Sequence, residues 1–126
     1  MISTKQTSLI AIDEFQPSQI VCLEHQNIYL YSEVIQVISD RQLCWVRPLV
    51  LAIIRDSLTT EKILDLRFTS DLLWPINLFR PALDTEVIPL LSELDSPDYR
   101  AESIQNARQQ LNYYIQQFWQ GANQDR

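Results

Sequence analysis

The chain has 126 residues, of which 46% are hydrophobic and 21% charged, and it carries a formal net charge of −6. A chain of this length forms one ordinary domain and buries roughly 60–70% of the surface that its unfolded form exposes, so it needs neither a metal nor disulfides to hold a core. The acidic balance and the presence of only two lysines, Lys5 and Lys62, argue against general binding to phosphate backbones or anionic membranes.

Apolar runs in the sequence are short. The longest, residues 49–54, falls far below the roughly 20 residues of a membrane-spanning helix, and residues 9–12 are too few for the apolar part of a secretory signal. We therefore expect no membrane span and a cytoplasmic protein. Cys22 and Cys44 lie within aliphatic and aromatic runs, which predicts buried free thiols, with pairing across neighbouring strands as the alternative.

Strand-like segments dominate the first two thirds of the chain. Gly121 is the only glycine, so left-handed turn positions are expected to fall on asparagine and aspartate. The predicted turns are residues 24–27, 39–42 and 55–60. The predicted strands are residues 20–23, 28–38, 43–54 and 62–68. Both faces of the segment 28–38 are largely apolar, which is typical of a barrel wall or a sandwich.

Pro48 interrupts the third predicted strand and lacks the N–H that an interior ladder needs. We expect a bend there, with residues 43–46 and 49–54 on different sides of the fold. Residues 71–75 are interpreted as a tight turn that leads into a closing segment, residues 76–79. This layout predicts a mainly β fold, a small SH3-like antiparallel β-barrel followed by a C-terminal amphipathic helix. The alternative is an open antiparallel α+β sheet with one packed helix.

The predicted division has an N-terminal segment (1–19), a barrel-like body (20–83), an acidic connector (84–97), a helix (98–120) and a frayed tail (121–126). Within the connector, Asp84 could cap a short helix that Pro89 would kink. The pair Ser96–Pro97 predicts where the long helix starts, and Gly121 predicts where it ends.

One stripe of the long helix is apolar, at Ile104, Ala107, Leu111, Ile115 and Phe118. We expect this stripe to dock on the chain's own barrel. The alternative is a homodimer through the helix, with a face widened by Tyr113, Tyr114 and Trp119.

Residues for catalysis or metal binding are sparse. His25 is the only histidine, and the two cysteines lack paired spacing, so neither a metal nor a cofactor is expected. Motifs for a phosphate-binding loop or an activated nucleophile are missing. The acids Glu33, Asp65 and Asp71 are the only argument for the alternative of a small enzyme of unknown chemistry, and we expect no enzyme.

Arginines stand beside aromatic residues at several points in the sequence. The candidate partner-binding residues are Trp45, Arg47, Arg67, Trp74, Phe79 and Arg80. Rigid rings and forked guanidiniums are typical of protein-recognition patches, so these residues predict a non-catalytic protein–protein interaction module. Alternatively, the rings are core residues and the arginines pair with Asp65, Asp71 or Asp84. A third interpretation, binding of single-stranded nucleic acid on a small barrel, is disfavoured by the negative charge.

Three short stretches, RQLCWVRPL (41–49), DLLWP (71–75) and LFRPALD (78–84), resemble segments of small cyanobacterial proteins without a characterised activity. The likeness covers residues 28–91. The resemblance implies a soluble cyanobacterial protein that serves as an accessory, assembly or regulatory factor, and photosynthetic complexes are one setting it suggests. It transfers no catalytic or binding residue to this chain.

Overall fold

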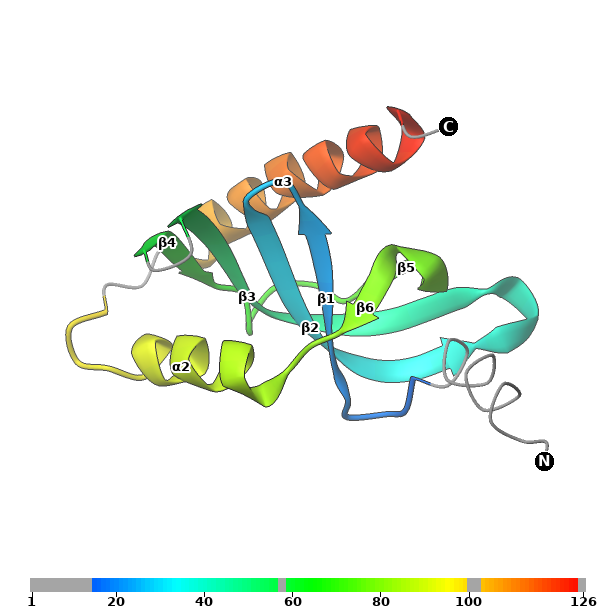
Figure 1. Cartoon of the computed structure of the whole chain (residues 1–126), viewed down its shortest axis with the longest axis horizontal. Helices are drawn as coiled ribbons and strands as arrows, with labels where there is room; N and C mark the ends of the chain where they lie inside the picture. Colours follow the sequence, from blue (N-terminus) through cyan, green and yellow to red (C-terminus); the bar gives the residue numbers. More distant parts are fainter. Residues whose placement is uncertain (1–14, 57–58, 100–102, 125–126) are drawn as a thin grey trace.

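The computed structural model describes residues 15–56, 59–99 and 103–124. Its elements are β1 (Ile20–His25), β2 (Ile28–Ile38), β3 (Leu43–Asp56), β4 (Thr59–Asp65), β5 (Leu72–Pro75), β6 (Phe79–Pro81), α2 (Asp84–Leu94) and α3 (Ile104–Gln124), with short 3-10 turns at Ser39–Arg41 and Ile76–Leu78 (Figure 1). The strands form one antiparallel sheet in the order β4-β3-β2-β1-β6, and β5 pairs with β3.

This sheet is not closed, so the expected SH3-like barrel is wrong. The open α+β alternative comes closer, but two helices follow the sheet instead of one. In the part of the chain that the structure describes, no helix is long and apolar enough to cross a membrane.

Two apolar clusters lie on opposite faces of the sheet, one under each helix. The cluster under α3 includes Leu30, Val34, Val46, Leu51, Leu64, Phe79, Ala107, Leu111 and Phe118. The cluster under α2 includes Cys22, Tyr31, Val50, Ala52, Val87, Leu90 and Leu94. Because neighbouring residues of a strand point to opposite faces, Leu30 and Tyr31 belong to different clusters. The two apolar faces of β2 therefore reflect a sheet covered on both sides, not a barrel wall.

Pro48 marks the point where β3 changes partner. Residues 43–46 pair with β5, whereas residues 50–56 pair with β4. The register against β2 also shifts there, because Val50 lies opposite Tyr31 but Pro48 lies opposite Ser32, which leaves one extra residue in β3. The prediction that residues 43–46 and 49–54 lie on different sides of the fold is wrong, because both halves of β3 belong to one sheet, and Pro48 lies at a bulge within it.

The predicted turn at 39–42 is confirmed, whereas the turn predicted at 24–27 is limited to residues 26–27, because β1 extends to His25. The chemistry of both turns differs from expectation. Among the described residues, positive φ occurs at Ser18, Gln26 and Gln42, and not at asparagine or aspartate. Gln42 has φ 57° and is held there by two hydrogen bonds to the Ser39 carbonyl oxygen, from its backbone N (3.1 Å) and from its side-chain Nε2 (2.7 Å). A glutamine side chain can therefore support the left-handed conformation by local hydrogen bonding.

The segment 71–83 also differs from the prediction. Residues 72–75 are a strand, not a turn, and the closing segment 76–79 is a 3-10 turn that leads into β6. The acidic connector contains α2, which continues through Pro89. Its first turn is held by Glu86, whose side chain accepts a hydrogen bond from the Leu83 N–H (2.9 Å). Asp84 is thus the first helical residue and not the cap.

The long helix begins later than predicted, at Ile104. Ser96 lies in a turn, where its hydroxyl accepts from the Asp98 N–H (3.2 Å). The cap of α3 is Ser103, whose hydroxyl accepts from the Asn106 N–H (3.1 Å). Part of the predicted helix, residues 100–102, lies outside the described ranges. The N-terminal segment up to residue 14 and residues 125–126 also lie outside them.

Docking of α3 on its own sheet is confirmed. Ala107, Leu111 and Phe118 are buried in the core cluster, and Ile115 packs against it, whereas Ile104 is exposed. Gly121 does not end the helix, which continues to Gln124. A Cβ at this position would collide with the ring of His25, so the glycine is needed for close approach between α3 and the β1–β2 turn.

Candidate functional site

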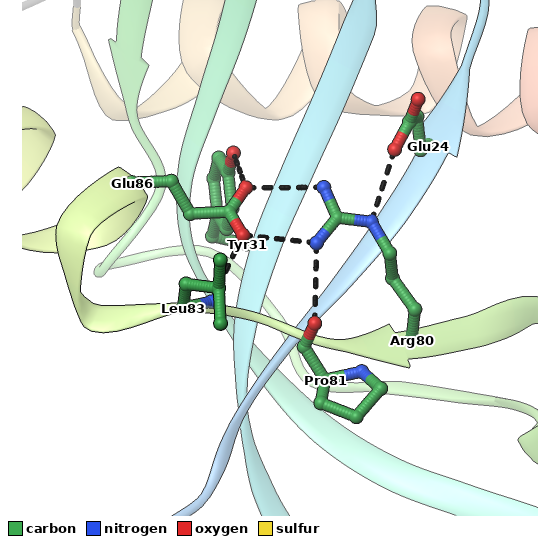
Figure 2. A network of polar contacts seen from close by, with 6 residues as sticks. All are labelled: Glu24, Tyr31, Arg80, Pro81, Leu83 and Glu86. Carbon is green, nitrogen blue, oxygen red and sulfur yellow. Dashed lines mark hydrogen bonds and ion pairs between the residues drawn. The ribbon is translucent and has the colours of Figure 1, made fainter.

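Arg80 is the centre of a polar network on the α2 side of the sheet (Figure 2). Its guanidinium donates two parallel hydrogen bonds to the carboxylate of Glu86 (2.9 and 3.0 Å) and a third to Glu24 (3.0 Å). The Tyr31 hydroxyl donates to the same Glu86 carboxylate (2.7 Å), and Arg80 also donates to the Pro81 carbonyl (3.1 Å). The network therefore joins β1, β2, β6 and the first turn of α2.

Ionisation states in this network are fixed by its contacts. The Arg80 hydrogen bonds lower the pKa of Glu86 to about 2, with burial opposing the shift. Hydrogen bonding to Glu86 in turn raises the pKa of Arg80 well above its usual value. Burial, followed by the hydrogen bond to Glu86, raises the pKa of Tyr31 far above its usual range. At neutral pH the network is a charged Arg–Glu pair with a neutral tyrosine, an arrangement suited to holding elements together.

Arg67 occupies a second ion-pair cluster, at the end of β4. It forms a two-point contact with the Asp65 carboxylate (2.9 Å for both bonds) and reaches Asp95 just after α2 (3.2 Å). Burial acts to raise the pKa of Asp65, but the hydrogen bonds from Arg67 outweigh it and lower that pKa. Arg67 therefore ties β4 to the C-terminal end of α2.

Trp45 and Arg47 project from the first half of β3, on the face opposite the α3 cluster. Both contact Asp71, which accepts from Trp45 Nε1 (2.9 Å) and from Arg47 Nε (3.4 Å). The cross-strand partner of Trp45 is Leu73 of β5, which is 51% exposed. An exposed tryptophan, leucine and arginine thus share one surface.

The six predicted patch residues do not form a single patch. Phe79 is buried in the α3 cluster, and Arg80 and Arg67 belong to the separate ion-pair clusters already described. Trp45 and Arg47 come together at Asp71, whereas Trp74, opposite Cys44, lies on the other face of the sheet and packs against the α3 cluster. All three arginines have the pairing with acids that the alternative interpretation expected. Arg47 pairs with Asp71 and Arg67 with Asp65, whereas Arg80 pairs with Glu86 and Glu24 and not with Asp84.

A groove of about 540 Å³ lies between β5 and the C-terminal half of α3. Its lining residues are Leu43, Leu73, Trp74, Pro75, Ile115, Gln116, Trp119 and Gln120. Trp74 meets Trp119 edge to face, with ring centroids 5.6 Å apart. Trp119 nevertheless remains 47% exposed, and none of the lining side chains is ionisable. The volume lies within the range of about 300–1,000 Å³ typical of ligand-binding clefts.

Trp119, Ile115 and the two glutamines were not among the predicted site residues. They lie some 40 residues or more beyond β5 in the sequence, and no local pattern links the two segments. The only available signal was that Trp119 falls outside the docking stripe of α3. A large ring that is not needed for docking is a candidate for contact with something else.

The remaining reactive side chains are packed away from this groove. Cys22 and Cys44 are free and buried on opposite faces of the sheet, so they cannot pair across neighbouring strands. Burial raises the pKa of Cys22 to about 12 and raises the pKa of Cys44. The ring of His25 packs edge to face on Phe118. Within the described ranges, no three histidine, cysteine or acidic residues gather as a metal site would require.

Comparisons of the chain with protein-family models, curated proteins and solved structures give no match.

Proposed function

We propose that this chain is a non-catalytic protein-binding module, an accessory factor of a larger assembly, and that it binds its partner in the groove between β5 and α3. The observation that carries the proposal is the tryptophan pair Trp74 and Trp119, which lines an open apolar groove while Trp119 stays half exposed. Partly exposed tryptophans in a concave apolar surface are the residues that contribute most to binding in protein interfaces.

The neighbouring surface supports the same assignment. Trp45 and Leu73 are exposed cross-strand neighbours on β3 and β5, next to the groove that Leu73 lines, and half of the Arg47 side chain is exposed on the same face. An apolar centre with a polar rim is the usual anatomy of an interface. Trp45, Arg47 and Trp74 thus remain candidate contact residues from the sequence, joined by Leu73 and Trp119.

Catalysis is left out of the proposal because the ionisable groups that gather in the described structure are used for holding elements together. Arg80 and Glu86 satisfy each other, and so do Arg67 and Asp65. The raised pKa values of Cys22 and Cys44 keep both thiols protonated at neutral pH, which makes them poor nucleophiles.

Affinity capture with two matched variants tests the proposal. The full chain, Trp119→Ala and Tyr113→Ala are immobilised and exposed to lysate from the organism that carries the chain. Tyr113 lies on α3, is 58% exposed and does not line the groove, so it controls for loss of an exposed ring from the same helix.

We expect a protein that the full chain and Tyr113→Ala retain and Trp119→Ala loses. The same protein, purified, should bind the full chain at least tenfold more tightly than it binds Trp119→Ala, since truncating a central tryptophan typically costs about 2 kcal/mol or more. Equal retention by all three chains would place the binding surface elsewhere and overturn the proposal.

A further inference from the structure

The pairing of β5 with β3 determines which backbone N–H and C=O groups of β5 face outward. Ile76 N donates to the Gln42 carbonyl oxygen (3.0 Å), which continues the β3–β5 ladder beyond the pair Leu43–Pro75. In an antiparallel ladder, hydrogen-bonded and non-hydrogen-bonded pairs alternate. Trp74 and Leu72 therefore direct their N–H and C=O groups toward β3, whereas Leu73 and Pro75 direct theirs away from it.

In the part of the chain that the structure describes, β5 has β3 as its only strand neighbour. Its outer edge consequently presents one donor, the Leu73 N–H, and two acceptors, the carbonyls of Leu73 and Pro75. Proline has no N–H to leave unpaired there, which explains why Pro75 is tolerated in this strand. Such a row of backbone groups is the template to which an added strand pairs.

The groove adjoins β5. Three of its lining residues, Leu73, Trp74 and Pro75, are consecutive in this strand and alternate between its two faces, and Leu43 of β3, opposite Pro75, also lines it. A chain added to the edge would place alternate side chains beside Trp74, on the face where Trp119 packs, and the others beside Leu73 and Pro75.

We propose, building on the function proposed above, that the groove binds an extended segment of another protein as an added β-strand beside β5. The segment spans about four residues, the length of β5, with apolar side chains on both of its faces. Acidic residues are absent from it, because the groove offers no cation and the chain carries a net charge of −6. Gln116 and Gln120 of α3 line the opposite side of the groove with uncharged amides.

A second copy of this chain is a poorer occupant. Two copies would each bring a net charge of −6 to the contact. The groove is lined by eight residues, whereas a stable interface takes about 20–30 residues from each partner. A short segment from a different protein needs no more surface than the groove provides.

Selection from a phage-displayed library of random ten-residue peptides on the full chain tests this inference. The expected consensus is a run of about four apolar residues without acidic residues. A selected peptide is then synthesised with a fluorescent label, in its plain form and with the backbone nitrogens of its core N-methylated, and titrated by fluorescence polarisation. N-methylation should weaken binding about tenfold or more, because it removes the hydrogen bonds to the β5 edge and keeps every side chain.

Two variants, each with a matched control, locate the contact on the chain. Leu73→Pro deletes the outward N–H without touching the β3 ladder and should weaken the plain peptide by a similar factor, while Leu73→Val retains binding. Trp119→Ala should abolish binding, and Tyr113→Ala should leave it unchanged. Circular dichroism and thermal melting check that each variant is folded, and the N-methylated peptide gives an answer that does not depend on any variant.

Failure of the strand-addition inference can be distinguished from failure of the proposed function. If Trp119→Ala abolishes binding but N-methylation and Leu73→Pro do not weaken it, the groove binds a partner without strand addition, so this inference falls and the proposed function stands. A helical or proline-rich consensus would likewise overturn strand addition and leave the proposed function standing. If no peptide binds in the groove, this inference is overturned, whereas the proposed function is decided by the capture experiment. A dimer in light scattering that Leu73→Pro dissociates would identify a second copy as the occupant and overturn the inference.

Discussion

Glu86 connects three elements of the fold through one carboxylate. Its carboxylate accepts hydrogen bonds from Arg80, Tyr31 and the Leu83 N–H, and thereby links β6, β2 and the first turn of α2. A carboxylate that is three-quarters buried is stable in its charged form only when such donors replace water. The consequence is the lowered pKa of about 2.

The lowered pKa predicts how stability depends on pH. Because the pKa of Glu86 is lower in the folded chain than in the unfolded one, its contribution is fully present above about pH 4.5 and is lost as the pH falls toward 2. At pH 7 we expect Glu86→Gln to lower the free energy of unfolding by about 2 kcal/mol, typical of charge-assisted hydrogen bonds. The difference from the wild type should shrink below pH 4.5.

Urea unfolding followed by circular dichroism between pH 2.5 and 7 measures this difference. Glu93→Gln, an exposed position on the same helix, serves as the control and should follow the wild type at every pH. A gap between wild type and Glu86→Gln that stays constant down to pH 2.5 would mean that the carboxylate is not held by Arg80 in solution.

Ser32 presents the opposite case, a buried polar group without a partner. It lies between Leu30 and Val34 on the α3 side of β2, opposite Pro48, and its hydroxyl has no hydrogen-bond partner within the described structure. A buried unpaired hydroxyl costs about 1–3 kcal/mol. Ser32→Ala should therefore raise the free energy of unfolding by about 1 kcal/mol and the melting temperature by about 3–6 °C.

Differential scanning calorimetry checks the Ser32→Ala prediction. Ser39→Ala, at an exposed serine in the turn after β2, should change the melting temperature little. A lower melting temperature for Ser32→Ala would show that the hydroxyl is hydrogen-bonded after all.

At the scale of elements, alternation and turn signals in the sequence located β2, β3 and the bulge at Pro48, since these depend on neighbours within a few residues. β5 was missed because Trp74–Pro75 has the local pattern of a turn, and only the outward direction of the proline nitrogen makes it compatible with a strand. The network around Arg80 was beyond local reasoning, because Glu24 lies 56 residues away in the sequence. The groove was beyond local reasoning for the same reason, because its walls, β5 and α3, are far apart in the sequence.

The contact between α3 and the β1–β2 turn gives a prediction about one glycine. Alanine favours a helix over glycine by about 1 kcal/mol, but a Cβ at position 121 would collide with the His25 ring. Gly121→Ala should therefore destabilise the wild type and stabilise a His25→Ala background by up to about 1 kcal/mol. Denaturant unfolding of the four chains in this double-mutant cycle measures the coupling, and an effect of equal sign in both backgrounds would show that His25 does not press on the helix.

At the scale of the whole molecule, the sheet is shared by two cores. Leu30 and Tyr31 are adjacent in β2 but belong to the clusters under α3 and α2 respectively, so the two cores depend on the same strands. The ion pairs of Arg80 with Glu86 and of Arg67 with Asp95 attach α2 to the sheet at its two ends. This arrangement favours unfolding of both layers in one step, because opening either face exposes strands that support the other.

Cys22 and Cys44 provide a natural probe of that cooperativity, one beneath each helix and both with no exposed surface. In sub-denaturing urea, N-ethylmaleimide should modify the two thiols at equal rates, and their protection free energies should agree within about 0.5 kcal/mol, because each becomes accessible only when the whole chain unfolds. Quenching followed by peptide mapping in a mass spectrometer measures both sites in the same unmodified chain, so no substitution disturbs either core. In Glu86→Gln both rates should rise together, by the factor that its loss of stability predicts. If Cys22 is modified earlier than Cys44, and Glu86→Gln accelerates Cys22 alone, then α2 opens as a separate unit and the two layers are not cooperative.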